Sequence, residues 1–139
     1  MKSLLLIILS CLISAITTQA QEITFQSEVY DYGDIELGSD GMSTFTFTNT
    51  GEQPLIIMDA KSTCGCLVVT YPKDPIMSGQ TVEIKGRYDT KRRGPFTKYI
   101  IVTTNAKNNS VVRLKISGRV LDKKEEMDTQ DGTINFFER

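Results

Sequence analysis

The sequence predicts an all-β protein, one sandwich of short strands that follows a cleaved N-terminal segment. From Ile23 onward, apolar and polar residues alternate with a period of two, turn residues interrupt the alternation at short intervals, and helical periodicity is absent. The chain has 139 residues, enough for one sizeable core and too few for two ordinary domains. We therefore expect a single folded domain.

The first twenty residues predict a secretory signal peptide. Lys2 gives a positive start, residues 4–16 are mostly apolar, and residues 18–20 form a small-x-small cleavage site. A permanent membrane anchor needs about 20 apolar residues, and two serines and a threonine interrupt this run. We place cleavage before Gln21 and expect an exported protein, periplasmic or secreted, with no membrane span after cleavage.

Cys11 offers an alternative, a lipoprotein anchored through its thiol. Two features disfavour it: Leu9 is bulky where a small residue is usual, and only ten residues precede the cysteine. If Cys11 leaves with the signal, the mature chain keeps two cysteines, Cys64 and Cys66, in a compartment where disulfides persist.

In two segments the alternation predicts which residues face the core. In residues 44–48 two phenylalanines alternate with threonines, so a strand there buries Phe45 and Phe47. In residues 81–88 Gly86 falls on the inner face, where it can admit the bulk of a neighbouring side chain.

Two longer segments also predict strands, and one of them is expected to be central. Residues 112–120 alternate inward apolar residues with outward Arg113, Lys115, Ser117 and Arg119, and residues 96–104 are largely apolar on both faces, which favours a strand covered on two sides. Further strands are expected at residues 23–25, 29–35, 54–60 and 67–71. About seven strands with these turn spacings indicate an immunoglobulin-like sandwich over residues 21–121.

Residues 122–139 change composition and predict a charged, solvated tail. Ile134, Phe136 and Phe137 are unusual in such a tail, because exposed aromatic residues generally pack against something. We favour an extra edge strand or loose docking on the domain. The alternative is a segment that adds to the sheet edge of a partner.

Composition excludes several function classes. The chain has no histidine, which removes Ser-His-Asp and Cys-His catalysis and histidine-based zinc sites. Acidic and basic residues nearly cancel, 17 against 16, so no bulk charge favours nucleic acid or an anionic membrane. We expect no enzyme activity, no cofactor and no nucleic-acid partner.

Short motifs, each weak alone, follow one another in a specific order. They are YDYGDI at 30–35, FTFTNTG at 45–51, PL at 54–55, TCGC at 63–66, PIMSG at 75–79, YDT at 88–90, GPF at 94–96, TTNA at 103–106 and LKISG at 114–118. Together they resemble a family of exported bacterial immunoglobulin-like domains of unknown function. The resemblance covers residues 29–120.

That family is in turn similar to Hydin-type and major-sperm-protein-like domains, which are non-enzymatic scaffolding modules on an immunoglobulin-like framework. The resemblance therefore implies the fold and a scaffolding type of role. Two positions depart from the family pattern: Thr63 replaces the usual serine, and Leu67 stands where threonine is often found. Neither changes the Cys-Gly-Cys core.

Cys64 and Cys66 are the one pair of residues with evident chemistry. In an extended strand their Cα atoms would lie about 6.6 Å apart, close to the outer limit for a disulfide, about 6.8 Å, and Gly65 can turn the chain to shorten this distance. The pair can shape the loop as thiols or a local bridge, act in thiol redox, bind Cu(I) through two thiolates, or form intermolecular bonds. The sequence leaves these alternatives open.

Lys91, Arg92 and Arg93 form a basic turn between two predicted strands. We favour a solubilising loop. The alternative is contact with an acidic polymer or lipid head group, which the outward cations of residues 112–120 would extend if that strand lies beside the turn.

Our leading hypothesis is a non-catalytic interaction or structural module of the bacterial cell envelope. It would bind another envelope protein or a glycan through a sheet face, a sheet edge or a loop end. The rival hypothesis is a small thiol redox or Cu(I)-handling protein acting through Cys64 and Cys66. The oligomeric state is left unassigned.

Overall fold

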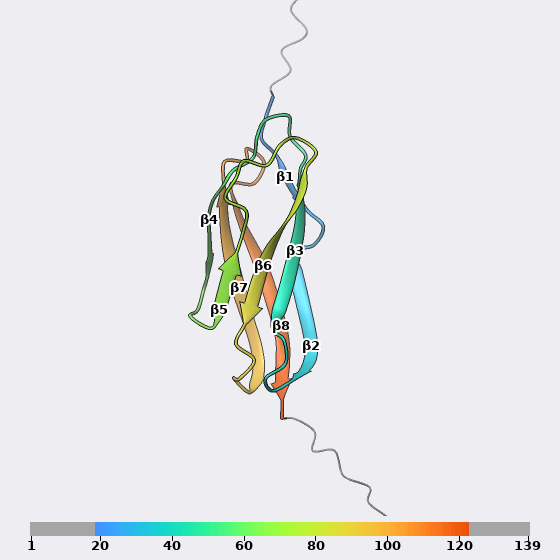
Figure 1. The fold of residues 1–139 in the computed structure, drawn as a ribbon, viewed down its shortest axis with the longest axis vertical. Helices are drawn as coiled ribbons and strands as arrows, with labels where there is room; N and C mark the ends of the chain where they lie inside the picture. Colours follow the sequence, from blue (N-terminus) through green and yellow to red (C-terminus); the bar gives the residue numbers. More distant parts are fainter. Residues whose placement is uncertain (1–18, 123–139) are drawn as a thin grey trace, which may run out of the picture.

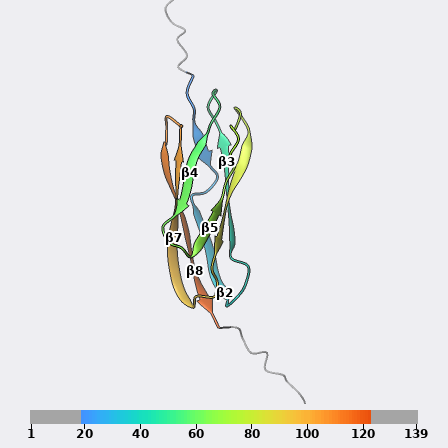
Figure 2. The same cartoon turned by 60° about the vertical axis from the view of Figure 1, so that its left-hand side comes forward.

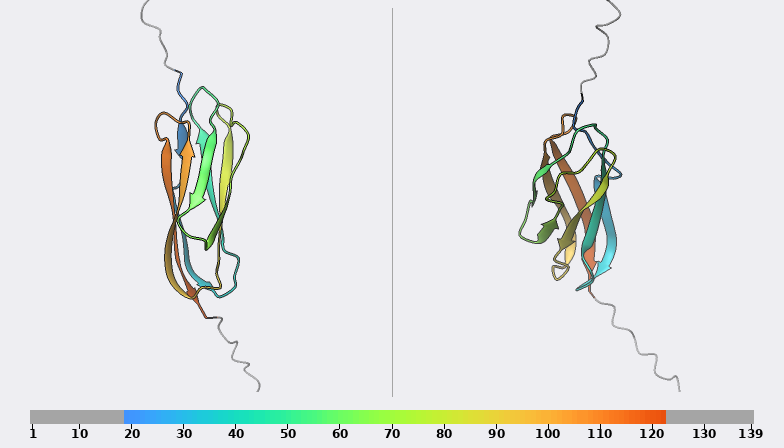
Figure 3. Two further views of the ribbon diagram at one scale, coloured as in Figure 1. Left: turned by 90° about the vertical axis from the view of Figure 1, so that its left-hand side faces the viewer. Right: turned by 45° about the horizontal axis from the view of Figure 1, so that its top comes forward.

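The computed structural model describes residues 19–122, which form two four-stranded sheets packed face to face. One sheet has the order β1-β3-β6-β5 and the other β2-β8-β7-β4 (Figure 1). The strands are β1 (Ile23–Phe25), β2 (Val29–Glu36), β3 (Met42–Asn49), β4 (Ile57–Ser62), β5 (Leu67–Thr70), β6 (Thr81–Tyr88), β7 (Gly94–Thr104) and β8 (Val111–Leu121). Figure 2 and the left view of Figure 3 show the two layers side by side.

This arrangement confirms the predicted all-β class, with eight strands in place of about seven. Each expected segment overlaps one observed strand, and residues 19–122 contain no helix. The predicted signal peptide, Cys11 and the tail after Asp122 lie almost wholly outside the described residues. Within residues 19–122 no helix is long and apolar enough to cross a membrane.

The N-terminal part of the chain contributes to both sheets. β1 pairs antiparallel with β3, and after a short connection β2 pairs parallel with β8 in the other sheet. The β2–β8 register shifts between Asp31 and Asp34, where Gly33 has a φ of 61°. Glycine adopts this left-handed conformation at little cost, so the bulge and the glycine belong together.

The core follows the predicted alternation. Phe45 and Phe47 of β3 are buried, whereas Thr44 of the same strand faces solvent. The inward Val112, Leu114, Ile116 and Val120 of β8 are also buried. Burying such apolar side chains from both sheets is the main favourable contribution to folding.

Gly86 is buried on the inner face of β6, close to side chains of both sheets. A Cβ atom there would lie 3.0 Å from Ile100 Cδ1 and from Ser43 Oγ, and 3.2 Å from Leu67 Cδ1. This confirms the expectation that the glycine admits a neighbour's bulk.

β7 is central in its sheet, between β8 and β4, as predicted. Its inner face, including Ile100 and Val102, is fully buried in the core. The expectation that it is covered on both sides is not met, because the residues described form only two layers and neither lies over its outer face. Tyr99 and Ile101 are therefore only half-buried.

We predict that Gly86→Val destabilises the domain by about 1–3 kcal/mol, because the added methyl groups must displace close-packed side chains. The control is Gly65→Ala, whose new Cβ would meet no atom within 4 Å and should change stability by less than about 0.5 kcal/mol. Urea unfolding of both variants measures the difference. Equal stabilities would contradict the packing assigned to Gly86.

Candidate functional site

Cys64 and Cys66 lie in the turn that carries the chain from β4 to β5. These are edge strands of different sheets, and both lie on the same side of the sandwich (Figure 1). The two cysteines are joined by a disulfide, with their Cα atoms 5.2 Å apart. This is shorter than the extended spacing, so the chain turns at Gly65 as expected.

The cysteine turn, residues 63–66, is held to both sheets by main-chain hydrogen bonds. The Thr63 N–H donates to the Tyr99 carbonyl at 3.0 Å, and the Tyr99 N–H donates to Thr63 Oγ1 at 3.3 Å. On the other side the Asp89 N–H donates to the Cys66 carbonyl at 2.8 Å. Ser62 Oγ donates to the Cys64 carbonyl and closes the turn. None of these bonds involves a sulfur atom.

The two sulfur-bearing residues differ in exposure. Cys66 is 7% exposed and belongs to the core, whereas Cys64 is partly buried at its margin. A disulfide that closes so small a loop stabilises little, about 1.6 kcal/mol in the chain-entropy model. The bond is therefore not a major staple of the fold.

A cleft of about 530 Å³ lies beside Cys66. Three segments that are distant in sequence meet there: the β2–β3 loop at residues 38–41, the cysteine turn with the start of β5, and residues 87–91 around the β6–β7 turn. Charges of both signs line it, from Asp40, Asp89, Arg87 and Lys91.

Tyr88 forms an aromatic part of the cleft lining. Its ring is stacked on Phe96, with centroids 3.9 Å apart and planes 15° from parallel. Burial raises the pKa of the Tyr88 phenol above its ordinary value, although the nearby Arg92 guanidinium opposes the shift. The phenol is therefore neutral at physiological pH and offers the cleft no negative charge.

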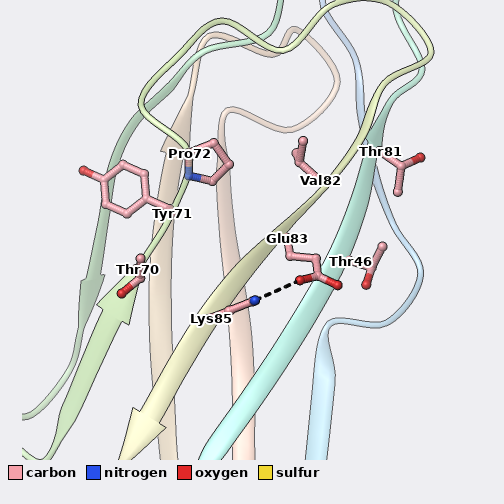
Figure 4. A pocket seen from close by; sticks show the side chains of 8 residues that line it. All are labelled: Thr46, Thr70, Tyr71, Pro72, Thr81, Val82, Glu83 and Lys85. Carbon is pink, nitrogen blue, oxygen red and sulfur yellow. Dashed lines mark ion pairs between the residues drawn. The ribbon is translucent and has the colours of Figure 1, made fainter.

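A second hollow, of about 610 Å³, lies over the outer side of β3, β5 and β6 (Figure 4). Its lining includes three threonines together with Tyr71, Pro72 and Val82. Its two charged side chains, Glu83 and Lys85, form an ion pair of 3.3 Å (Figure 4). Both charges are satisfied by each other, so this hollow brings together no group for catalysis.

The outer face of the β2-β8-β7-β4 sheet exposes apolar side chains among polar and charged ones. Strand register places Val111 beside Thr103 and Ile101 between Lys61 and Arg113. This outer face comprises Val29, Met58, Tyr99, Ile101 and Val111, with Lys61, Arg113 and Lys115 among them. By contrast, the outer positions of β3 and β6 are threonines and charged residues apart from Met42.

A family model described as "Protein of unknown function (DUF1573)" matches residues 23–120. The chain belongs to the DUF1573 family. The family suspected from the order of short motifs is thereby confirmed, together with its neighbourhood of immunoglobulin-like, PapD-like and major-sperm-protein-like folds. No curated protein matches the chain in sequence.

Solved structures similar to this DUF1573 domain share its fold at low identity. A protein of unknown function from Porphyromonas gingivalis W83 has a TM-score of 0.65 and 15% identity over 76% of this chain, which spans half (50%) of that protein. The ASH/PapD-like domain 7 of human CEP192 has a TM-score of 0.63 and 10% identity, over 80% of this chain and 93% of that one. WR4, an MSP family member of C. elegans, has a TM-score of 0.51 and 10% identity, over 73% of this chain and 99% of that one.

The basic turn of this DUF1573 domain is largely engaged with nearby carboxylates. Arg92 Nε lies 3.5 Å from Asp89 and Arg93 Nε lies 2.9 Å from Asp122, while Lys91 lines the cleft. β8 does neighbour the turn, but only through its last residues, since Arg119 pairs with Pro95. Arg113 lies six residues away, about 20 Å along the strand, over the ring of Tyr99 at 5.0 Å.

The described part of the DUF1573 domain brings together no cluster of metal ligands. Residues 19–122 contain no group of three or more Cys, Asp or Glu side chains that could hold an ion. Cys64 and Cys66 are joined to each other, and a disulfide supplies no thiolate for a soft metal.

Sequence reasoning identified the apolar outer side of β7 but missed the exposed residues that border it. Met58 is 58% exposed and Val111 is 53% exposed. Met58 faces outward because the β4–β7 register shifts between Ile57 and Asp59, so that Met58 and Asp59 lie on one side. A bulge of this kind has no reliable sequence signal, so the outward position of Met58 was not predicted.

We predict that reducing the disulfide lowers the free energy of unfolding by no more than about 2 kcal/mol, because the loop it closes is so short. Urea unfolding with and without dithiothreitol measures this. The anchors of Thr63 and Cys66 are main-chain bonds that persist on reduction. A loss above about 4 kcal/mol would instead mean that the bond holds the sandwich together.

Proposed function

We propose that this DUF1573 domain is a non-catalytic interaction module of the bacterial cell envelope. It binds another envelope protein through the outer face of the β2-β8-β7-β4 sheet. The observation that carries this proposal is the apolar outer side of β7, which none of the described residues covers. A central strand with apolar side chains on both sides is typical of a sheet that is covered on both sides.

The composition of the outer face supports a protein partner. Tyr, Met and Arg are enriched in protein interfaces, and this face contains Tyr99, Met58 and Arg113. Exposed apolar side chains that gather on one surface indicate an interaction site, whereas single ones are common on any protein. Cations beside Ile101 on both neighbouring strands add polar contacts for specificity.

A glycan partner is less consistent with this face. Sugar binding generally needs an open aromatic ring for the sugar to stack on, and the ring of Tyr99 is covered by the Arg113 guanidinium at 5.0 Å. The same arrangement is well suited to a protein partner, because the guanidinium keeps donors free for a carboxylate while it rests on the ring.

The non-catalytic part of the proposal rests on the chemistry available. The chain has no histidine, and the hollow on the opposite sheet contains only an internally paired Glu83 and Lys85. The signal peptide predicted at residues 1–20 supports an envelope location. The structural neighbours support the scaffold only, since one fold serves many functions.

The rival function, thiol redox or Cu(I) handling, depends on Cys64 and Cys66 rather than on the outer face. A Cys64→Ser, Cys66→Ser double variant therefore separates the two, because it keeps partner binding under our proposal. The disulfide favours the redox form of the rival over the metal form, since Cu(I) needs two free thiolates.

We predict that p-benzoylphenylalanine in place of Val111 captures a discrete protein partner in intact cells, and that adding Ile101→Glu reduces this adduct at least tenfold. The substitution removes the apolar contact of Ile101, and the new carboxylate engages the flanking Lys61 and Arg113, which are then no longer available to the partner. The control places the same photocrosslinker at Thr44, an exposed position on the opposite sheet, where no such adduct should form. Adduct mass is read by gel shift and mass spectrometry.

Circular dichroism must show that the Ile101→Glu variant is folded. A second variant, Arg113→Glu, changes the charge of the outer face at an exposed residue. Equal capture from Val111 and Thr44, or capture that survives both charge changes, would contradict the assigned face. A Val111 adduct that consists of carbohydrate would replace the protein partner with a glycan.

A further inference from the structure

We propose that the Cys64–Cys66 disulfide is a site of thiol–disulfide exchange with a cysteine-containing polypeptide. Cys64 is the sulfur that the incoming thiolate attacks, and Cys66 is the leaving group. This inference is independent of the outer face, from which the cysteine turn is separate.

Access distinguishes the two sulfur atoms. Cys66 belongs to the buried core, whereas Cys64 is only partly buried, at the start of the turn. Gly65, between the two cysteines, is exposed, and a Cβ added to it would meet no atom within 4 Å. An attacking thiolate must approach the sulfur along the S–S axis, so the less covered sulfur is the one it reaches.

The cleft beside Cys66 suits the leaving thiolate. When the partner thiolate bonds to Cys64 Sγ, the S–S bond breaks and its electron pair goes to Cys66 Sγ. Lys91 and Arg87 line the cleft that Cys66 borders, and cations favour a thiolate over a thiol. Asp40 and Asp89 bring opposing charge to the same cleft, but Asp89 is itself engaged by Arg92 at 3.5 Å.

The turn is anchored independently of the bond that exchange breaks. Thr63 is held by Tyr99 and the Cys66 carbonyl by Asp89, and these hydrogen bonds use main-chain groups and a threonine hydroxyl. The two cysteines therefore stay adjacent after the S–S bond between them is broken. In the mixed disulfide the Cys66 thiolate can attack Cys64 Sγ and expel the partner thiolate, which restores both starting species.

A partner with two cysteines would instead be oxidised by this domain. Its second thiolate attacks its own sulfur in the mixed disulfide, so the partner gains a disulfide and this domain becomes a dithiol, with electrons and atoms balanced. The cleft favours a polypeptide over a small thiol. It offers charges of both signs and Val68, which is 67% exposed at its edge, enough to contact residues that flank a cysteine.

The test compares Cys66→Ser, which keeps Cys64, with Cys64→Ser, which keeps Cys66, in protein purified from its own envelope. Each variant reacts with a synthetic decapeptide whose single cysteine is activated as a thionitrobenzoate mixed disulfide. We expect the variant that keeps Cys64 to form the peptide adduct at least tenfold faster. Peptide mapping locates the adduct and separates it from any reaction at Cys11.

A second arm uses the wild-type disulfide and the reduced peptide. Acid quenching should trap the mixed disulfide on Cys64, and Lys91→Gln should slow its formation while Arg93→Gln, outside the cleft, does not. Glutathione in place of the peptide should react more slowly. Equal rates for the two single-cysteine variants, an adduct on Cys66, or loss of the folded circular dichroism spectrum on reduction would each overturn the proposal.

The two proposals fail separately. If exchange fails while the Val111 photoadduct persists in the double serine variant, the cysteine pair only shapes the turn and the interaction module stands. If the photoadduct fails while exchange is fast and specific to Cys64, the cysteine turn becomes the main function of the domain.

Discussion

The antiparallel pairing of β7 with β8 determines where the candidate surfaces of this domain lie. The pairing runs without a register shift from Gly94 opposite Val120 to Thr103 opposite Val111. One side of this ribbon supplies Ile100 and Leu114 to the core, and the other side forms the outer face. Because side chains alternate strictly, a slip by one residue would exchange the two sides and destroy both the core and the outer face.

The same ribbon positions the cysteine turn. The side chain of Tyr99 lies on the outer face, where its ring contacts Arg113. The main-chain N–H and carbonyl of Tyr99 form hydrogen bonds with Thr63, the first residue of the turn. The turn then reaches the other sheet through the Cys66 carbonyl and Asp89. The turn therefore connects the edge strands β4 and β5 of the two sheets and is hydrogen-bonded at both ends. Its geometry does not require the disulfide. That leaves the S–S bond free to have a chemical rather than a structural use.

Much of the fold was predictable because it depends on local alternation. The burial of Phe45 and Phe47 and the close approach at Gly86 follow from a period of two and one missing side chain. The cleft was not predictable, because residues 38–41 meet the cysteine turn only through sheet pairing between segments distant in sequence. The parallel β2–β8 pair and the outward Met58 depend likewise on register and on bulges, which composition does not encode.

The fold alone does not choose between the outer face and the cysteine turn as the functional site. The sandwich occurs in structural neighbours at 10–15% identity, so the framework tolerates nearly complete replacement of its surface. What is particular to this chain is where it departs from a solvated sandwich. An apolar outer side on a central strand costs solubility unless a partner covers it, and a disulfide across one residue adds little stability. Because stability explains neither feature, we attribute both to function.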